Sequence, residues 1–267
     1  MNWMKKVAVA LVCLLPLGLQ AAKVDTLQVK SPSMNKSIEV VVVSPDMAAT
    51  EACPVIYLLH GYGGNARTWV GIKPDLPKIA DEKGIFFVCP DGKNTWYWDS
   101  PLNADVRYET FISDELVKYV DSHYKTVADR KGRAITGLSM GGHGAMWNGL
   151  RHSDVFSAAG STSGGVDIRP FPKNWEMSVQ IGEKAKYPEN WEKYTVINLV
   201  PTLRKDQIAL IFDCGDSDFF LEVNKNYHEA LLNKASTTTL SLARVIMIHN
   251  TGIILLITRS SFSGSIS

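Results

Sequence analysis

The stretch ITGLSMGGHG, from Ile135 to Gly144, places a serine between glycines where two different sequence patterns meet. The segment before it, RAITGL, reads as a buried strand, and the segment after it, GGHGAMWNGL, reads as a helix. Gly137 and Gly141 frame Ser139 in a G-x-S-x-G pattern, which is typical of a sharp strand-to-helix turn whose backbone packs too closely for side chains. We therefore predict that Ser139 is a nucleophile and that the Met140 N–H points at the oxyanion its attack creates.

A second glycine turn lies upstream of the serine. The apolar run VIYLL ends in the sequence HGYGG, from His60 to Gly64. A turn of this kind supplies the second oxyanion N–H beside a serine elbow, and the backbone of Tyr62 is the predicted donor. The alternative is an ordinary glycine turn at the end of a strand, but both motifs occur in the chain order that such a site requires.

Strand-like and helix-like segments alternate along the chain. The sequence predicts strands near residues 37–46, 54–64, 85–92, 133–139, 156–165 and 208–216, and helices near 74–84, 108–124, 141–152 and 221–234. This alternation predicts an α/β fold with a doubly wound, mainly parallel sheet, and the serine turn specifies the α/β-hydrolase fold. Residues 166–204 are rich in Pro, Lys, Glu and Trp without clean periodicity, and we expect an insertion that covers an edge of the sheet.

The first 22 residues predict an exported protein, periplasmic or secreted. A basic start, MNWMKK, precedes the apolar run VAVALVCLLPLGL and the small residues QAA, as in a signal peptide (residues 1–22). Residues 23–234 are then the hydrolase domain. Removal of the signal leaves 26 basic against 27 acidic residues with no block of like charge, so neither nucleic acid nor stable membrane insertion is expected.

Three cysteines remain after the predicted signal: Cys53, Cys89 and Cys214. No C-x-x-C spacing is present, so no metal site is expected. One disulfide with one thiol, or three buried thiols, both fit the sequence.

Three aspartates follow the apolar run IALIF, where the acid of a serine–acid–histidine triad belongs: Asp213, Asp216 and Asp218. Their spacing does not choose among them. The motifs LLHGYGG, NTWYWDSP, ITGLSMGGHGAM and DCGDSDFF together resemble the esterase D family, which includes S-formylglutathione hydrolases, feruloyl and acetylxylan esterases and mycolyltransferases. The resemblance covers about residues 38–234 and is greatest to exported bacterial members. It implies that Asp218, before the pair Phe219-Phe220, is the acid, and that no cofactor is needed.

The general base is the missing member of the predicted site. Five of the six histidines have unsuitable positions. His60 belongs to the glycine turn, and His123 and His152 end predicted helices. His143 lies on the helix that follows the serine, and His228 lies on the helix that directly follows the acid. His249 alone has the right order and approximate distance. Its surroundings differ from the family pattern, in which an Arg-Pro-Gly-x-His segment is followed by Tyr-Trp and a closing helix.

A shift of reading frame accounts for this loss of resemblance. Joining the third base of each codon to the first two of the next permits, from Arg244 onward, the reading Gly-Asn-His-Asp-Pro-Gln-Tyr-Trp. We hypothesise that residues 235–267 are an aberrant tail in a shifted frame, so that the base is not encoded in the printed frame. The alternative is that His249 serves as a substitute.

These features predict a serine esterase that hydrolyses carboxylic esters through an acyl-serine intermediate. The expected substrates are small-molecule or polysaccharide esters, of the acetyl or feruloyl type, on extracytoplasmic carbohydrate. The alternatives are an acyltransferase of the same fold and a catalytically impaired carbohydrate-binding relative. Trp96 and Trp98 are predicted either to contact the substrate or to belong to a core aromatic cluster.

Overall fold

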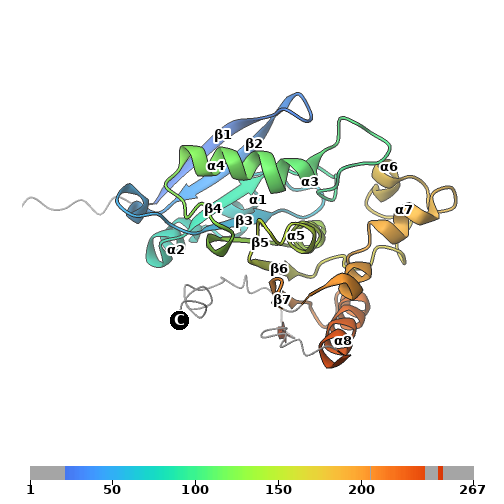
Figure 1. The fold of residues 1–267 in the computed structure, drawn as a ribbon. Helices are drawn as coiled ribbons and strands as arrows, with labels where there is room; N and C mark the ends of the chain where they lie inside the picture. Colours follow the sequence, from blue (N-terminus) through green and yellow to red (C-terminus); the bar gives the residue numbers. More distant parts are fainter. Residues whose placement is uncertain (1–21, 205, 238–245, 249–267) are drawn as a thin grey trace, which may run out of the picture.

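A single twisted sheet organises the chain (Figure 1). The computed structural model describes residues 22–204, 206–237 and 246–248, and the predicted signal peptide and most of the predicted aberrant tail lie outside them. Eight strands form the sheet within these residues: β1 (Lys23–Ser31), β2 (Lys36–Ser44), β3 (Val55–Leu59), β4 (Phe86–Pro90), β5 (Arg133–Gly137), β6 (Ala158–Thr162), β7 (Ala209–Asp213) and β8 (Ile246–Ile248).

The order of the strands is β1-β2-β4-β3-β5-β6-β7-β8. β1 pairs with β2 and β2 with β4 in antiparallel fashion, and the remaining pairs are parallel. The predicted mainly parallel α/β sheet is therefore confirmed. β1 was not expected, because its sequence KVDTLQVKS is largely polar, and its pairing with β2 is what makes it a strand.

Helices connect the strands. They are η1 (Asp46–Ala49), α1 (Thr68–Ile72), α2 (Leu76–Lys83), α3 (Tyr108–Thr110), η2 (Phe111–Glu115), α4 (Leu116–His123), η3 (Arg130–Gly132), α5 (Met140–Arg151), α6 (Met177–Ile181), α7 (Pro188–Lys193), η4 (Val196–Thr202) and α8 (Leu221–Thr237). The helix predicted near residues 108–124 is a continuous stretch of α3, η2 and α4 with a π-helical turn at its centre.

The two faces of the sheet bury separate cores, as the alternation of side chains along a strand requires. On β2, Val40 and Val42 belong to the core that also contains apolar side chains of α4 and α5, whereas Val41 and Val43 belong to the core beneath α1 and α2. Both faces thus carry helices, which is the doubly wound arrangement.

Two details of the prediction need correction. The insertion at residues 166–204 does not cover an edge of the sheet. It packs over the carboxyl ends of the strands, where Tyr194 donates a hydrogen bond to the Asp99 carbonyl and the Gln180 carbonyl accepts one from Ser100 (Figure 1). The last strand of the sheet was expected to be disrupted, yet residues 246–248 form a short β8 parallel to β7.

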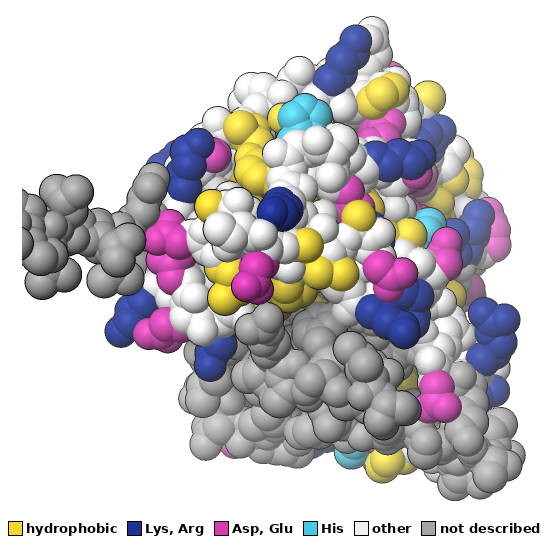
Figure 2. Space-filling model, turned by 60° about the vertical axis from the view of Figure 1, so that its left-hand side comes forward, with side chains coloured by type: hydrophobic (Ala, Val, Ile, Leu, Met, Phe, Trp, Pro, Cys, Tyr) yellow, Lys and Arg dark blue, Asp and Glu magenta, His cyan; other side chains and the backbone are white. Residues whose placement is uncertain are grey.

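The surface carries interspersed charges. Figure 2 shows cationic and anionic side chains mixed on one face of the molecule, without a block of like charge. Cys53, Cys89 and Cys214 are buried, and no disulfide joins them to one another, which is one of the two arrangements that the sequence left open. Among the described helices, none is long and apolar enough to cross a bilayer.

A buried carboxylate ties α3 to the end of α5. The Glu109 side chain is 6% exposed and accepts hydrogen bonds from Trp147 Nε1 at 2.7 Å, Arg151 Nε at 2.8 Å and His152 Nε2 at 2.8 Å. Removing the carboxylate leaves the buried Trp147 indole N–H unpaired and takes the counter-charge away from the partly exposed Arg151.

We expect Glu109→Ala to lower the free energy of unfolding by about 2–4 kcal/mol. Urea denaturation followed by circular dichroism measures this. Glu82→Ala removes an exposed carboxylate paired with Lys78 and is the control, with an expected change below about 0.5 kcal/mol. Equal losses in the two variants would show that the Glu109 cluster contributes nothing beyond a surface pair.

Candidate active site

Ser139 occupies a strained turn between β5 and α5. Its backbone has φ 55° and ψ −117°, a conformation that residues with side chains rarely adopt. A Cβ on Gly141 would lie 2.2 Å from the Leu59 carbonyl oxygen, and one on Gly137 would lie 2.3 Å from the Gly141 carbonyl oxygen. The glycines of the motif are therefore required because three backbone segments meet here.

The predicted oxyanion turn lies against the serine. A Cβ on Gly61 would be 3.5 Å from the Ser139 Cβ, so the turn at residues 61–64 adjoins the elbow. Within the described residues, no hydrogen bond uses the N–H of Tyr62 or of Met140, whereas the N–H groups of Gly63 and Gly64 are bonded. The two predicted donors are thus unoccupied.

His60 fixes the start of this turn. Its buried ring accepts a hydrogen bond from the Gly92 N–H at Nε2 (2.9 Å) and donates one from Nδ1 to the Gly61 carbonyl (2.7 Å). The hydroxyl of Tyr97 donates to the His60 carbonyl at 3.0 Å. Since both ring nitrogens are used, His60 is a structural residue of the turn.

His143 lies on α5, one helical turn after Ser139, and its buried ring is also hydrogen-bonded at both nitrogens. Trp98 Nε1 donates to its Nε2 at 2.8 Å, and its Nδ1 donates to the Gly165 carbonyl at 2.8 Å. Burial lowers the pKa of this histidine to about 4, although the hydrogen bond to Gly165 opposes the shift. His143 is therefore neutral at pH 7 and holds the loops that follow β4 and β6 against the nucleophile helix.

The other described histidines are also engaged away from the serine. His152 bonds Glu109, His123 bonds the Tyr119 carbonyl on the surface of α4, and the His228 ring lies 6.0 Å from that of Phe212. In the described part of the chain, no histidine ring is hydrogen-bonded to the Ser139 hydroxyl or to an aspartate of residues 213–218, and His143 contacts Ser139 only through a backbone hydrogen bond within α5. His249 lies outside the described residues.

The three candidate aspartates have different environments. Asp213 ends β7 and is 7% exposed, Asp216 is exposed, and Asp218 is half-buried. Asp218 Oδ1 accepts the Phe220 N–H at 2.7 Å, which fixes the carboxyl within its turn. The sheet brings Asp213 close to the elbow, because the Thr162 carbonyl accepts the Ser139 N–H and Thr162 pairs with Asp213.

The two predicted substrate tryptophans are core residues. The indoles of Trp96 and Trp98 are 1% and 0% exposed and stack on each other with centroids 5.6 Å apart. Of the two roles predicted for them, the structure places them in the core aromatic cluster. Within the described residues, no three His, Cys, Asp or Glu side chains lie together as a metal site.

Sequence reasoning missed a group of aromatic rings beside Asp218. Trp175, from the insertion, lies 5.2 Å from Phe219 and 5.1 Å from Phe220 between ring centroids, and Phe171 lies 5.5 Å from Trp175. Phe219 is 61% exposed, and Trp175 is half-buried. We call these four rings the aromatic wall. The Trp-rich composition of the insertion was the available signal, but it does not say which tryptophan faces the site.

The aromatic wall is connected to the oxyanion turn. The Trp175 carbonyl accepts a hydrogen bond from Trp96 Nε1 at 3.2 Å, and the neighbouring Glu176 accepts one from Asn94 Nδ2 at 3.3 Å. Asn94 Oδ1 in turn accepts the Gly63 N–H at 2.9 Å. The insertion therefore contacts both the acid turn and the loop that supports the oxyanion turn.

We predict that Asp213→Asn stabilises the protein at high pH. Burial raises the pKa of the Asp213 carboxyl to about 6, although Thr162 Oγ1 at 3.5 Å opposes the shift. The ionised carboxylate is thus disfavoured in the fold, and the stability of the wild type falls as pH rises from about 4 to 6. We expect a gain of about 1 kcal/mol at pH 8 that vanishes near pH 4.

Urea denaturation at the two pH values measures this difference. Asp216→Asn, in the exposed part of the same turn, is the control and is expected to show no pH-dependent gain. A gain for Asp213→Asn that is equal at both pH values would mean that packing, rather than charge, is responsible.

The site and the fold have counterparts among known proteins. The Esterase family model matches residues 31–246. An esterase of Mycobacterium tuberculosis is 30% identical over 149 residues, which are 53% of this chain and 32% of that protein. The acetyl esterase of Caldicellulosiruptor saccharolyticus is 25% identical over 203 residues, which are 69% of this chain and 73% of that protein.

A solved structure shares the architecture as well. A ferulic acid esterase superposes with a TM-score of 0.70 at 27% identity, over 87% of this chain and 91% of that chain. The chain thus spans about a third of the mycobacterial relative but most of the length of the other two. The resemblance stated from the sequence motifs is confirmed: the chain belongs to the Esterase family and has the α/β-hydrolase fold.

Proposed function

We propose that this protein hydrolyses carboxylic esters through a covalent acyl-Ser139 intermediate. The observation that carries the proposal is the strained elbow, with Ser139 at φ 55° and the N–H groups of Met140 and Tyr62 free of partners among the described residues. Ser139 Oγ attacks the ester carbonyl, and the two N–H groups bind the oxyanion. The alcohol leaves with a proton from the base, and water then releases the acid. Asp218 orients the base.

We propose that the working base is the histidine of the shifted frame, at the junction of the codons for Ile246 and Met247. The histidine environments support this, because the rings of His60 and His143, which lie near the elbow, are bonded to other groups at both nitrogens. The sheet supports it as well. One face of the sheet is covered by α1 and α2 but is less covered over β5 and β7. On this face Thr136 and Ile211 are only half-buried, and they line a small hollow together with Gly160. The closing helix of the shifted frame would cover such a face.

The aromatic wall favours an aromatic acyl group over an acetyl group. An exposed ring beside the acid turn provides a flat apolar surface on which a feruloyl-type ring can stack. The similarity to a ferulic acid esterase supports this choice, and the similarity to an acetyl esterase leaves acetyl esters as the second candidate. With the predicted signal peptide, the proposed substrate is an aromatic ester of extracytoplasmic carbohydrate.

Restoring the frame is expected to restore the activity. The protein expressed from a gene whose reading frame is corrected after codon 234 is called the corrected chain. It should hydrolyse p-nitrophenyl acetate at least about 10³-fold faster than the printed chain, because a triad without its base keeps only the contributions of the oxyanion donors and of substrate binding. Ser139→Ala in the corrected chain is the control and should abolish the activity.

Equal rates for the printed and corrected chains would show that the printed chain already contains its base. His249→Ala in the printed chain then tests the substitute directly. The esterase proposal would be contradicted if the corrected chain hydrolysed the ester slowly and its intact mass showed no acyl group on Ser139.

The aromatic wall is tested by Trp175→Ala in the corrected chain. Loss of one stacking partner should raise KM for methyl ferulate about three- to tenfold, whereas kcat/KM for p-nitrophenyl acetate should change less than twofold. Steady-state kinetics with both esters measure the contrast. Parallel losses on both esters would indicate damage to the elbow rather than loss of a ring contact.

A further inference from the structure

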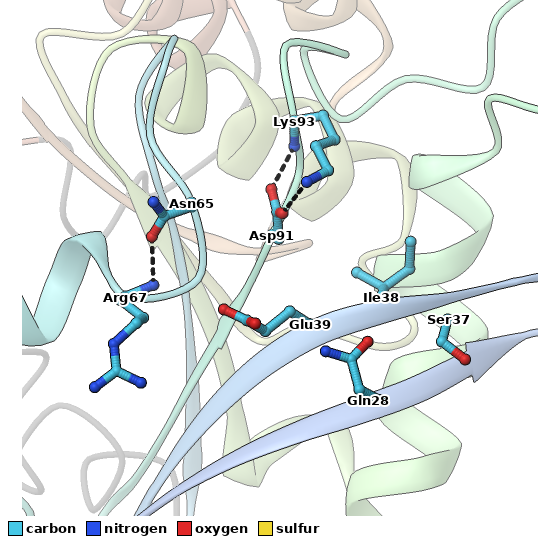
Figure 3. Close-up of a pocket in the computed structure, with 8 residues that line it drawn as sticks. All are labelled: Gln28, Ser37, Ile38, Glu39, Asn65, Arg67, Asp91 and Lys93. Carbon is cyan, nitrogen blue, oxygen red and sulfur yellow. Dashed lines mark hydrogen bonds and ion pairs between the residues drawn. The ribbon is translucent and has the colours of Figure 1, made fainter.

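A polar hollow lies beside Asn65, the residue that follows the oxyanion turn (Figure 3). Its volume is about 390 Å³, within the range of small-ligand sites. Two strands and two loops line it: β1, β2, the loop after β3 and the loop after β4. The lining residues are Gln28, Ser37, Ile38, Glu39, Asn65, Arg67, Asp91 and Lys93.

The hollow exists because the sheet extends beyond its helical cover. Gln28 pairs directly with Glu39 across β1 and β2, and Ser37 lies two residues away on the same face. This is the face on which Val41 and Val43 are buried under α1 and α2. Glu39 lies beyond that cover, so the strands present polar side chains to a space bounded by the chain that leads into α1.

The side chains of the hollow carry unused hydrogen-bonding capacity. Those of Gln28, Ser37 and Glu39 make no hydrogen bond with any described residue, whereas Asp91 is held by the Lys93 N–H at 2.9 Å and by its Nζ at 2.6 Å. Figure 3 shows Glu39 between Gln28 and Asp91. The hollow therefore offers donors and acceptors on rigid strands, next to a fixed ion pair.

The charges of the lining exclude a strongly ionic ligand. Two cations, Arg67 and Lys93, face two carboxylates, Glu39 and Asp91, so the lining has no net charge. Ile38 is its apolar member and is 4% exposed, so it offers little surface to an apolar ligand. A neutral ligand with many hydroxyl groups matches this pattern of mixed donors and acceptors.

The position of the hollow relates it to the ester site. Asn65 directly follows the turn that contains Tyr62, and Asn94, next to Lys93, accepts the Gly63 N–H at 2.9 Å. Because β3 lies between β4 and β5 in the sheet, the oxyanion turn after β3 separates Ser139, which follows β5, from the loop after β4, which lines the hollow. We call this turn the partition. A chain molecule whose ester is at Ser139 can cross this partition and place a further unit in the hollow.

We propose that the hollow is a carbohydrate subsite, which binds a sugar unit of the polysaccharide that carries the ester. The inference rests on the proposed function for its substrate, but binding in the hollow does not require the base. It is therefore tested on the printed chain, without catalysis.

Affinity electrophoresis in native gels that contain soluble arabinoxylan provides the test. The printed chain should be retarded in proportion to the polysaccharide concentration. The double variant Gln28→Leu with Ser37→Val removes exposed polar groups that have no partner among the described residues, so the fold should be retained. It should bind about tenfold more weakly, as expected for two lost hydrogen bonds. Lys30→Leu, on the same face of β1 but outside the hollow, is the control and should bind within twofold of the unmodified chain.

Two results overturn the proposal: no retardation of the unmodified chain, or equal retardation of the double variant. Retardation lost in Trp175→Ala but kept in the double variant also overturns it, because the aromatic wall is then the binding surface. If circular dichroism shows that the double variant is unfolded, Ser37→Tyr replaces it, since a large side chain fills the hollow from an exposed strand position. If Ser139 is not acylated but the double variant still loses its binding to arabinoxylan, the esterase proposal is rejected and the subsite proposal stands.

Discussion

The close approach of backbone to backbone around Ser139 is the constraint on which the site depends. The Leu59 carbonyl, at the end of β3, lies so near Gly141 that a methyl group would overlap it. α5 can begin there only if the chain turns sharply out of β5, which forces Ser139 to φ 55°. The same approach places the glycine turn after β3 against the serine. The proposed nucleophile and the proposed oxyanion donors thus belong to one packing arrangement, built from two strand ends and a helix start.

Buried neutral histidines hold the loops around this elbow. His60 connects the oxyanion turn to the loop after β4, and His143 connects Trp98 to Gly165. Each ring donates from one nitrogen and accepts at the other, so burial costs no unpaired polar group. Histidines close to a nucleophile in sequence therefore serve as structural clamps here. The base that we propose lies in another segment, after β7.

The loops at the carboxyl edge create two unlike surfaces on either side of the oxyanion turn. On the side of the acid turn, the insertion contributes Trp175 to an apolar wall. On the side of the β1–β2 hairpin, polar side chains without partners among the described residues face a hollow of balanced charge. An aromatic acyl group is apolar like the wall, and a hydroxyl-rich polysaccharide chain is polar like the hollow. The proposed substrate joins them in one molecule, with the reacting carbonyl at the partition between the two surfaces.

The sequence by itself determined the features that local geometry requires. The glycines around Ser139 specify the elbow, apolar runs that end in glycine specify the buried parallel strands, and the order along the chain places the three acid candidates at and after the end of the strand that is β7. Tertiary structure decided the rest. β1 is a strand because β2 pairs with it, and Trp96 and Trp98 are buried because the insertion packs over them, although a Trp-rich loop is equally compatible with an exposed site. The aromatic wall and the polar hollow each combine side chains from segments far apart in the chain. Periodicity reports which face of its own element a residue occupies, but it carries no information on which distant segment meets that face.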